Sequence, residues 1–247
     1  MTVNRARLFE GYQPSVFAAG NRLTEQEYVL MSEFYSSNYG PYLPERKDAP
    51  VLDVGCGAGH FLYFLKARGY TAMTGIDLSP ELVEHCRRTI WTNVVHGDAV
   101  DYLARNPSGF ELVCANDIVE HLPKNDVIGF LSACRQGLAE GGRLLVKVPN
   151  MSNPFASDLR YRDFTHEAGY TESSLRQILY LAGFPAIRIF GSVHPAKGWK
   201  ARVHRVAEKA LHAFIRRALM EMHYSVPSSF SKLLIAVAQG QRSARSA

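Results

Sequence analysis

The chain has 247 residues, of which 47% are hydrophobic and 21% are charged. This composition excludes an intrinsically disordered protein and suffices for one large α/β core. The formal net charge of +5 is too small to indicate nucleic-acid binding by itself.

The sequence carries no signal of export or of disulfide chemistry. The stretch MTVNRARLFEGYQ lacks the apolar segment of a secretory signal, and the longest apolar run, residues 233–238, is too short to cross a bilayer. The four cysteines lie far apart without C-x-x-C spacing, which favours reduced thiols over disulfides or a zinc site. We therefore expect a cytoplasmic protein.

Residues 1–47 are predicted to form a helical lead-in. Thr24 and Glu27 make the T-x-x-E pattern of a helix N-terminus, and Gly40 and Pro41 end that helix.

From residue 48 to residue 150, short apolar strands alternate with helical patterns. Strands are predicted at 51–55, 71–77, 93–98, 110–117 and 142–150, with helices at 59–69, after Ser79 and at 126–139, the last one stopped by Gly141 and Gly142. Nearly all-apolar strands separated by helices indicate a parallel sheet covered on both faces. Such sheets bind ligands at the carboxyl ends of their strands.

After residue 150 the pattern loosens. Residues 151–170 form a loop without hydrophobic period, and loops of that length are often functional. A helix (172–182), a strand (186–193), a long basic amphipathic helix (198–222) and a closing strand (232–239) follow. We expect the lead-in, residues 48–150 and residues 151–247 to form a single domain.

The stretch VLDVGCGAGHF joins the first strand to the first helix of this pattern. Gly55, Gly57 and Gly59 allow a tight turn and a close approach of the backbone to a ligand, and the helix start offers free N–H groups. The spacing is not that of a dinucleotide loop, because His60 stands where the third glycine of G-x-G-x-x-G belongs. No G-K-[ST] of a phosphate-binding P-loop follows either.

Three acids lie at the carboxyl ends of the first three strands. Asp53 lies inside the first strand, Asp77 ends the second and Asp98 ends the third. A carboxylate in the position of Asp77 can accept both hydroxyls of a ribose. One such aspartate alone could be a helix cap or a turn former, but three beside a glycine loop indicate a ligand site.

These stretches resemble the class I S-adenosylmethionine-dependent methyltransferases. VLDVGCGAG is similar to the first motif of that family, TGIDLS to the second and HGDA to the third; NDIVEHLP and LAEGGRLLVKVPN are similar to its signatures at the fourth and fifth strands. The resemblance implies a doubly wound, Rossmann-like, mostly parallel sheet of seven strands, with the basic helix inserted before the last strand. It also implies S-adenosylmethionine as methyl donor and S-adenosylhomocysteine as product.

The same resemblance assigns cofactor contacts. The glycine loop would approach the methionine part, Asp77 would hold the ribose, Asp98 and Ala99 would lie at the adenine edge, and Asn116 or Asp117 would lie near the methionine ammonium or the substrate. The residues expected at the cofactor are Asp53, Gly55, Cys56, Gly57, Gly59, Asp77, Leu78, Asp98, Ala99, Asn116 and Asp117.

The acceptor is less constrained. NDIVEHLP lacks the aromatic N-P-P-Y or D-P-P-Y of enzymes that methylate nucleic-acid bases, so we expect no nucleic acid as partner. A divalent metal is the less favoured alternative, because the fifth strand ends in VPN without a further Asp, although Asp117 and Asn150 could contribute.

Residues 163–184 are similar to methyltransferases of bacterial polysaccharide and glycolipid gene clusters. This implies a hydroxyl of a sugar, glycan or glycolipid as acceptor. The alternatives are a small-molecule O-methyltransferase acting on a phenol, quinone precursor or natural product, and a cofactor-binding module without catalysis.

His166 is the first candidate for a catalytic base. It lies in the polar stretch DFTHEAGYT on the long loop, where Asp163 or Glu167 could orient its ring. His121, in VEHLP, is the competing candidate. Without a catalytic role, His166 would be an exposed loop histidine or a cap of the helix after Thr171, and His121 would be a buried histidine that packs the loop after the fourth strand.

Arg160 and Arg162 flank the same loop and could bind a carboxylate or phosphate of an acidic sugar or sugar nucleotide. Their alternative is a solvated pair. Tyr39, Tyr42 and Phe155 are further candidates for the pocket wall.

The helix at 198–222 accounts for the positive charge of the chain. Residues 197–217 hold seven Lys or Arg and one Glu, a net charge of +6. Its apolar stripe could pack on the domain or on a second subunit in a homodimer. Alternatively it could contact an anionic membrane, placing the protein at the inner face of the membrane.

Overall fold

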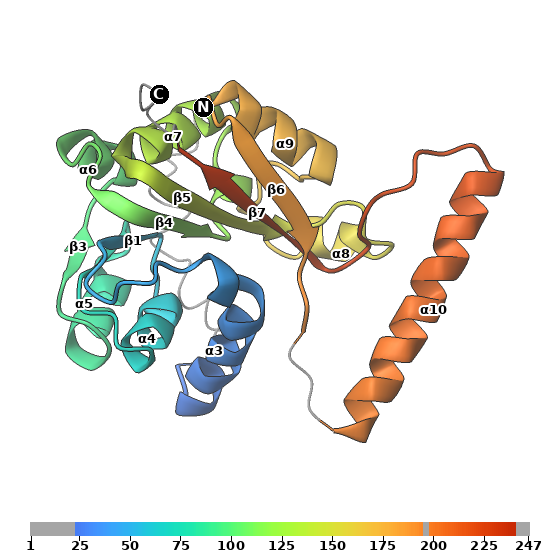
Figure 1. The fold of residues 1–247 in the computed structure, drawn as a ribbon, viewed down its shortest axis with the longest axis horizontal. Helices are drawn as coiled ribbons and strands as arrows, with labels where there is room; N and C mark the ends of the chain where they lie inside the picture. The colour runs from blue at the N-terminus through green and yellow to red at the C-terminus, as the bar shows by residue number, and fades with distance from the viewer. Residues whose placement is uncertain (1–22, 195–197, 241–247) are drawn as a thin grey trace, which may run out of the picture.

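The computed structural model of the protein describes residues 23–194 and 198–240 (Figure 1). Seven strands form one sheet in the order β3-β2-β1-β4-β5-β7-β6. The strands are β1 Val51–Val54, β2 Met73–Asp77, β3 Val94–His96, β4 Phe110–Asn116, β5 Leu138–Pro149, β6 Ala186–Gly191 and β7 Leu233–Gln239. β1 to β5 pair in parallel, and β7 is antiparallel to β5 and β6. The predicted doubly wound, mostly parallel seven-stranded sheet is confirmed.

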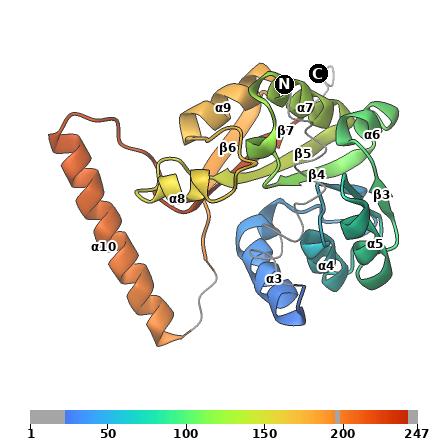
Figure 2. The ribbon, with the colours of Figure 1, turned by 180° about the vertical axis from the view of Figure 1, so that it is seen from behind.

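Helices cover both faces of this sheet, with α3, α4 and α5 on one face and α6, α7 and α9 on the other (Figures 1 and 2). The helices are α3 Glu25–Tyr39, α4 His60–Ala67, α5 Pro80–Thr89, α6 Ala99–Arg105, α7 Lys124–Gly137, α8 Ala156–Tyr161, α9 Glu172–Leu181 and α10 Trp199–Glu221, with 3-10 turns η2 Gly40–Tyr42 and η3 Val119–His121.

The central strand β4 divides its side chains between two cores. Leu112 and Cys114 pack in the core with residues of α3 and α4, whereas Val113 and Ala115 pack in the core with residues of α7 and α9. All four are fully buried. Successive side chains of a strand point to opposite faces, so an unbroken apolar run is what a strand covered on both faces requires.

Side-chain caps begin the helices that follow β2 and β3. Ser79 Oγ accepts a hydrogen bond from the Leu82 N–H (3.3 Å), and Asp98 Oδ1 accepts one from the Val100 N–H (2.8 Å). The Asp98 cap starts α6, a helix that the sequence analysis did not predict. Both caps fix helix N-termini, with their partial positive charge, at the carboxyl edge of the sheet.

The boundary between α7 and β5 lies earlier than predicted. The helix ends at Gly137 instead of residue 139, because the buried Leu138 already pairs with Phe110 at the start of β5. The register then shifts, and a Cβ at Gly142 would lie 2.9 Å from the Phe110 carbonyl oxygen. Gly142 therefore permits an irregularity within β5 and does not stop the helix.

Other predicted elements agree within a few residues. The loop predicted at 151–170 contains the short helix α8. The lead-in before residue 23, Lys197 of the basic segment and the tail after residue 240 lie outside the described residues. All four cysteines are buried free thiols, as predicted. Within residues 23–194 and 198–240, no helix combines the length and the apolar character needed to cross a bilayer.

Candidate cofactor and acceptor site

The loop between β1 and α4 follows the conformation that its glycines allow. Gly55, Gly57 and Gly59 all have positive φ (64°, 51° and 84°). A Cβ at Gly55 would lie 2.0 Å from Ile118 Cδ1, and one at Gly59 would lie 2.5 Å from Cys86 Sγ. Gly55 and Gly59 are therefore required for two reasons: a side chain would strain this backbone conformation, and no space is left for a Cβ.

Asp77 ties this loop to the end of β2. Its Oδ2 accepts a hydrogen bond from the Gly57 N–H (2.8 Å), and its Oδ1 accepts one from the Ser79 N–H (2.9 Å). Burial raises the pKa of the Asp77 carboxyl, and the N–H donors of Ser79 and Gly57 act in the opposite direction. The carboxylate is thereby fixed at the wall of a cavity, where a ribose hydroxyl can donate to it.

That cavity has a volume of about 640 Å³, within the range of small-molecule sites. It is lined by every residue predicted to contact the cofactor except Gly59, which holds the turn behind them. His121 also lines it, whereas His166, Asp163, Arg160 and Arg162 are not among its lining residues. The apolar part of the wall includes Met31, Tyr35, Ile118, Leu122 and Phe130.

Asp117 and Lys147 form an ion pair at the carboxyl ends of β4 and β5. The Lys147 ammonium lies 2.7 Å from Asp117 Oδ2, and the Lys147 side chain is buried. Asp117 is held at a positive φ of 54°. Asp53 lies on the same wall, and burial raises the pKa of its carboxyl, with a further contribution from Cys86. Lys147 could not be predicted as a site residue, because the sequence around a single lysine in an apolar strand does not indicate which acid it pairs with.

His121 is oriented by a chain of hydrogen bonds across the long loop. Thr165 Oγ1 donates to Asp163 Oδ1 (2.7 Å), so it accepts from the His121 Nδ1–H (2.8 Å). This arrangement leaves Nε2 as the unprotonated nitrogen of the neutral ring. Burial lowers the pKa of His121, and the neighbouring His166 lowers it further. Asp163 was expected to orient His166 but is connected, through Thr165, with His121.

His166 lies against His121, with ring centroids 4.7 Å apart. Its Nδ1 lies 3.1 Å from the Leu159 carbonyl oxygen, a distance at which Nδ1–H donates to that oxygen. The N–H groups of Glu167 and Ala168 donate to the Glu120 carbonyl (2.7 and 3.1 Å), which fastens the loop to η3. Two segments far apart in the sequence therefore place the two histidines side by side.

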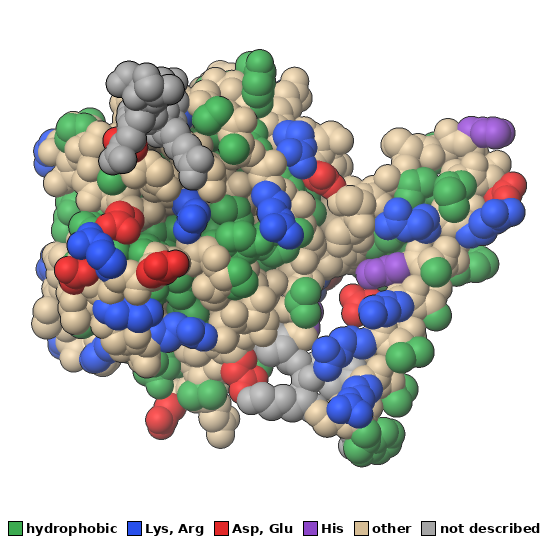
Figure 3. All heavy atoms as spheres, viewed as in Figure 1, with side chains coloured by type: hydrophobic (Ala, Val, Ile, Leu, Met, Phe, Trp, Pro, Cys, Tyr) green, Lys and Arg blue, Asp and Glu red, His purple; other side chains and the backbone are tan. Residues whose placement is uncertain are grey.

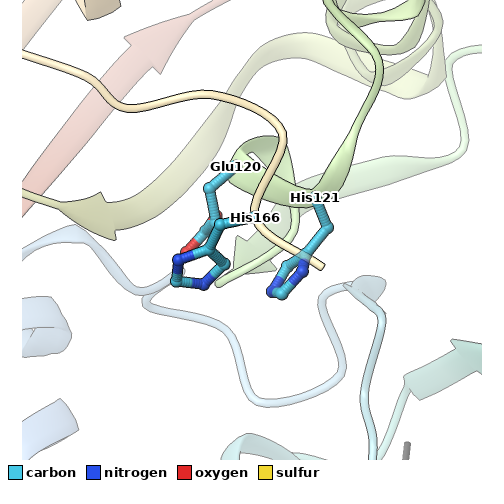
Figure 4. Close-up of side chains that lie close together, drawn as sticks. All are labelled: Glu120, His121 and His166. Carbon is cyan, nitrogen blue, oxygen red and sulfur yellow. The ribbon is translucent and has the colours of Figure 1, made fainter. Parts of the chain in front are cut away.

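Glu120 completes this cluster, in which its side chain and those of His121 and His166 lie close together (Figure 4). One ligand atom from each residue lies within 4.8 Å of the others. Glu120 is 1% exposed, and neither carboxylate oxygen has a hydrogen-bond partner among the described residues. Burial raises the pKa of the Glu120 carboxyl well above its usual range, and the charge of Asp117 adds to this. Two imidazoles and a carboxylate are a donor set that can hold a divalent cation.

Sequence reasoning did not single out Glu120. The signal available was its place beside His121 in NDIVEHLP, directly after the fourth strand. Asp117 and Asn150, the two residues considered as possible metal ligands from the sequence, are engaged by other groups. Asp117 pairs with Lys147, and Asn150 Nδ2 donates to the carbonyls of Ser229 (3.0 Å) and Ser231 (2.8 Å).

The two arginines predicted to bind the substrate contact other groups of this chain instead. Arg160 donates to the carbonyl oxygens of His166 (2.6 Å) and Glu167 (3.0 Å). Arg162 pairs with Asp158, one helical turn before it. Of the aromatic candidates, Tyr39 is buried and donates to Asn116 Oδ1, Tyr42 stacks on Phe190, and Phe155 is exposed.

Comparison with known proteins identifies the family. Residues 26–188 match a family model described as "Methyltransferase domain". A ubiquinone biosynthesis O-methyltransferase of Xylella fastidiosa is 36% identical over 110 residues, covering 41% of this chain and 42% of that protein. The protein of the same name from Xanthomonas campestris pv. campestris (strain B100) is 36% identical over 107 residues, covering 41% and 44%. The chain thus spans less than half the length of these curated relatives.

Solved structures share the fold. A SAM-dependent methyltransferase from Archaeoglobus fulgidus superposes with a TM-score of 0.66 at 22% identity, covering 91% of this chain and 98% of that one. A phosphoethanolamine N-methyltransferase 2 of Haemonchus contortus, solved with S-adenosylhomocysteine, gives 0.61 at 14% identity, covering 98% and 59%. At these identities the likeness concerns the fold.

Acidic groups of the cavity wall suit two polar parts of S-adenosylmethionine, the ribose hydroxyls and the ammonium. The predicted acids line the cavity: a carboxylate such as that of Asp77 can accept hydrogen bonds from ribose hydroxyls, and acids such as Asp53 and Asp117 can attract an ammonium group. The missing Cβ at Gly55 leaves the space that Ile118 occupies beside the loop. S-adenosylmethionine is the cofactor that this fold and this pocket fit.

Proposed function

Because the chain belongs to the methyltransferase-domain family, we propose that it is an S-adenosylmethionine-dependent O-methyltransferase acting on a hydroxyl of a small molecule, such as a phenol or a quinone precursor. The sequence analysis placed a sugar or glycan hydroxyl first and this acceptor class second. The comparisons support the second better, since the curated relatives reported above are named for ubiquinone biosynthesis. No comparison reported above supports a polysaccharide pathway.

The observation that carries the proposal is the position of His121 at the cavity wall and the neutral form of its ring. It lines the cofactor cavity, its Nδ1–H is committed to Thr165, and burial keeps the ring neutral. A neutral imidazole with an unprotonated nitrogen at the cavity wall can accept the proton of a hydroxyl. His121 thereby replaces His166 as the first candidate for the base, and His166 becomes a neighbour that tunes it.

The cofactor, when bound, supplies a methyl group already activated by the sulfonium. The tasks left to this chain are to hold the acceptor in line, to exclude water and to remove the hydroxyl proton. Asp77, the glycine loop and His121 line the same cavity. In this proposal Asp77 and the glycine loop hold the donor, and His121 serves the acceptor.

The pocket wall supports a ring-shaped acceptor. Met31, Tyr35, Ile118 and Leu122 give it an apolar surface. Arg160 and Arg162, which an acidic sugar would need, are engaged by loop carbonyls and by Asp158 instead.

Acceptor classes can be separated with a methyl-labelled donor. Purified protein would be incubated with labelled S-adenosylmethionine and fractions of a bacterial extract holding glycans, glycolipids, nucleic acids or small aromatic molecules. We expect label in the small aromatic fraction, and about 100-fold less with His121→Ala. Label in the glycan fraction would restore the sugar interpretation, and cofactor binding without label in any fraction would support a non-catalytic module.

A second way to activate the hydroxyl is a divalent cation held by Glu120, His121 and His166. The unpartnered, buried Glu120 carboxylate is the observation that favours it, because such groups normally have a partner. The protein would be stripped with EDTA, dialysed against Mg²⁺, Mn²⁺, Co²⁺ or Zn²⁺ and analysed for bound metal, with Glu120→Gln alongside. One equivalent of metal in the wild type, lost in Glu120→Gln, together with metal-dependent turnover, would establish the cation. Metal-independent turnover would leave His121 acting alone.

A further inference from the structure

Helix α10 stands apart from the sheet and its covering helices (Figures 1 and 2). The chain leaves β6 at Gly191 and returns to β7 at Leu233, and α10 occupies the excursion between these two paired strands. Near its C-terminal end it touches the returning segment: the His212 ring lies 5.5 Å from that of Phe230, and Arg216 donates to the Ser228 carbonyl (3.2 Å).

An apolar stripe runs along α10 on the side opposite to His212 and Arg216. It consists of Trp199, Val203, Val206, Ala210 and Phe214, whose spacing of three or four residues places them on one helical face. Val203, Val206 and Phe214 are 58%, 68% and 71% exposed, and Trp199 is 71% exposed. Figure 3 shows hydrophobic side chains along the outer edge of the α10 region. Water-exposed apolar surface in this contiguous form marks an interaction surface.

Basic side chains cover the side of α10 that the stripe leaves free, and Figure 3 shows Lys and Arg side chains all along the helix. Arg202 is exposed at the edge of the stripe, whereas Arg205 and Lys209, seven residues before His212 and Arg216, are exposed on the polar side. Glu208 is the single acid between residues 197 and 217, and Glu221 at the helix end pairs with Arg217. Two copies of α10 packed face to face would bring like charges together, which disfavours a second copy as the occupant. The charge instead complements a surface that is both apolar and anionic.

We propose that α10 is a membrane-docking helix, which lays its apolar stripe into the interface of an anionic phospholipid bilayer. Trp199 and Phe214 enter at the level where acyl chains meet headgroups, Arg202 at the edge of the stripe contacts lipid phosphates, and Arg205 and Lys209 on the polar side add to the attraction of the anionic surface. The inference goes beyond the proposed function and holds for any acceptor. An acidic protein surface or a second copy is the competing occupant.

Sedimentation with sucrose-loaded vesicles tests the proposal on the full chain. One set of vesicles is phosphatidylcholine alone, and the other holds about a quarter phosphatidylglycerol. We expect at least about tenfold stronger partitioning to the anionic set, weakening as salt is raised. Equal binding to both sets, or binding to neither, would overturn the proposal.

Variants separate the two parts of the surface. Val206→Ser with Phe214→Ser removes apolar area, and Arg202→Gln with Lys209→Gln removes charge; each pair should weaken partitioning about tenfold or more. The matched controls are Tyr180→Ser on α9, which is 72% exposed, and Arg88→Gln with Arg105→Gln on α5 and α6. Controls that lose binding as strongly as the α10 variants would contradict the assignment to α10. Circular dichroism and cofactor affinity verify that every variant is folded.

Analytical ultracentrifugation without vesicles addresses the competing occupant. A monomer that binds anionic vesicles supports the membrane assignment. A dimer that the Val206→Ser, Phe214→Ser variant dissociates, in a protein that does not bind vesicles, would assign the stripe to a second copy and overturn the proposal.

Discussion

Single side chains of this protein act through the hydrogen bonds that fix them. Asp77 is placed by two backbone N–H groups, and His121 is placed by Thr165 and Asp163. In both cases the orienting partners lie on other segments, so the position of the functional atom depends on the whole edge of the sheet.

Replacing Asp77 should weaken cofactor binding without unfolding the chain. Asp77→Asn removes the charge at the ribose position and disturbs the Gly57 N–H contact. Hydrogen bonds to charged groups are worth about 1.5–3 kcal/mol, so the Kd for S-adenosylmethionine should rise roughly 10- to 100-fold. Isothermal titration calorimetry measures this, with Asp48→Asn, an exposed aspartate away from the cavity, as the control. An unchanged Kd would remove Asp77 from the cofactor site.

The pH profile should report His121. A base must be unprotonated, and the pKa of His121 is lowered from its ordinary value of 6.5. A plot of kcat/KM against pH should therefore decline on its acid side, the acid limb, with a midpoint below pH 6.5, and it should reach a plateau at higher pH. His166→Gln removes one cause of the lowered pKa, so it should move the limb upward toward 6.5. A limb that His166→Gln leaves in place would argue against His121 as the titrating group.

At the scale of elements, the β1–α4 loop and the turn η3 form two sides of the site. The first is fixed by backbone conformation, since three glycines with positive φ bring the chain against Ile118 and Cys86. The second is fixed by the backbone N–H groups of Glu167 and Ala168, which donate to the Glu120 carbonyl. Arg160 in turn holds the carbonyls of His166 and Glu167. Both sides are therefore fixed mainly through the backbone, the first by the conformation of its glycines and the second by its hydrogen bonds.

Gly55→Ala should destabilise the protein by about 1–3 kcal/mol, because the new Cβ meets Ile118 and the residue has positive φ. Urea unfolding measures the change. Adding Ile118→Ala should recover only the steric part of the loss. Gly129→Ala in α7, where nothing lies within 4 Å of the new Cβ, is the control and should be neutral or slightly stabilising. A Gly55→Ala protein as stable as the wild type would show that the loop can relax.

At the scale of the whole molecule, the sequence predicts the sheet and the cofactor edge well. Apolar runs such as VLDV and FELVCAN, and the glycines and acids that follow strands, depend on local chemistry and can be recognised locally. The cluster of Glu120, His121 and His166 could not be predicted as a unit, because Thr165 and His121 meet across 44 residues of sequence. The position of α10 was also left open, since its amphipathic pattern is the same for a packed helix and for a docked one.

The dependence of methyl transfer on His121 tests the central claim most directly. Wild type and His121→Ala would be compared in single turnover with two catechol-like acceptors, one with an ordinary phenol pKa and one already ionised at neutral pH. We predict that the variant loses about 100- to 10,000-fold with the first acceptor and little with the second, since an ionised hydroxyl needs no base. Equal losses with both acceptors would contradict His121 as the base, and no transfer by the wild type to either would contradict the proposed acceptor class.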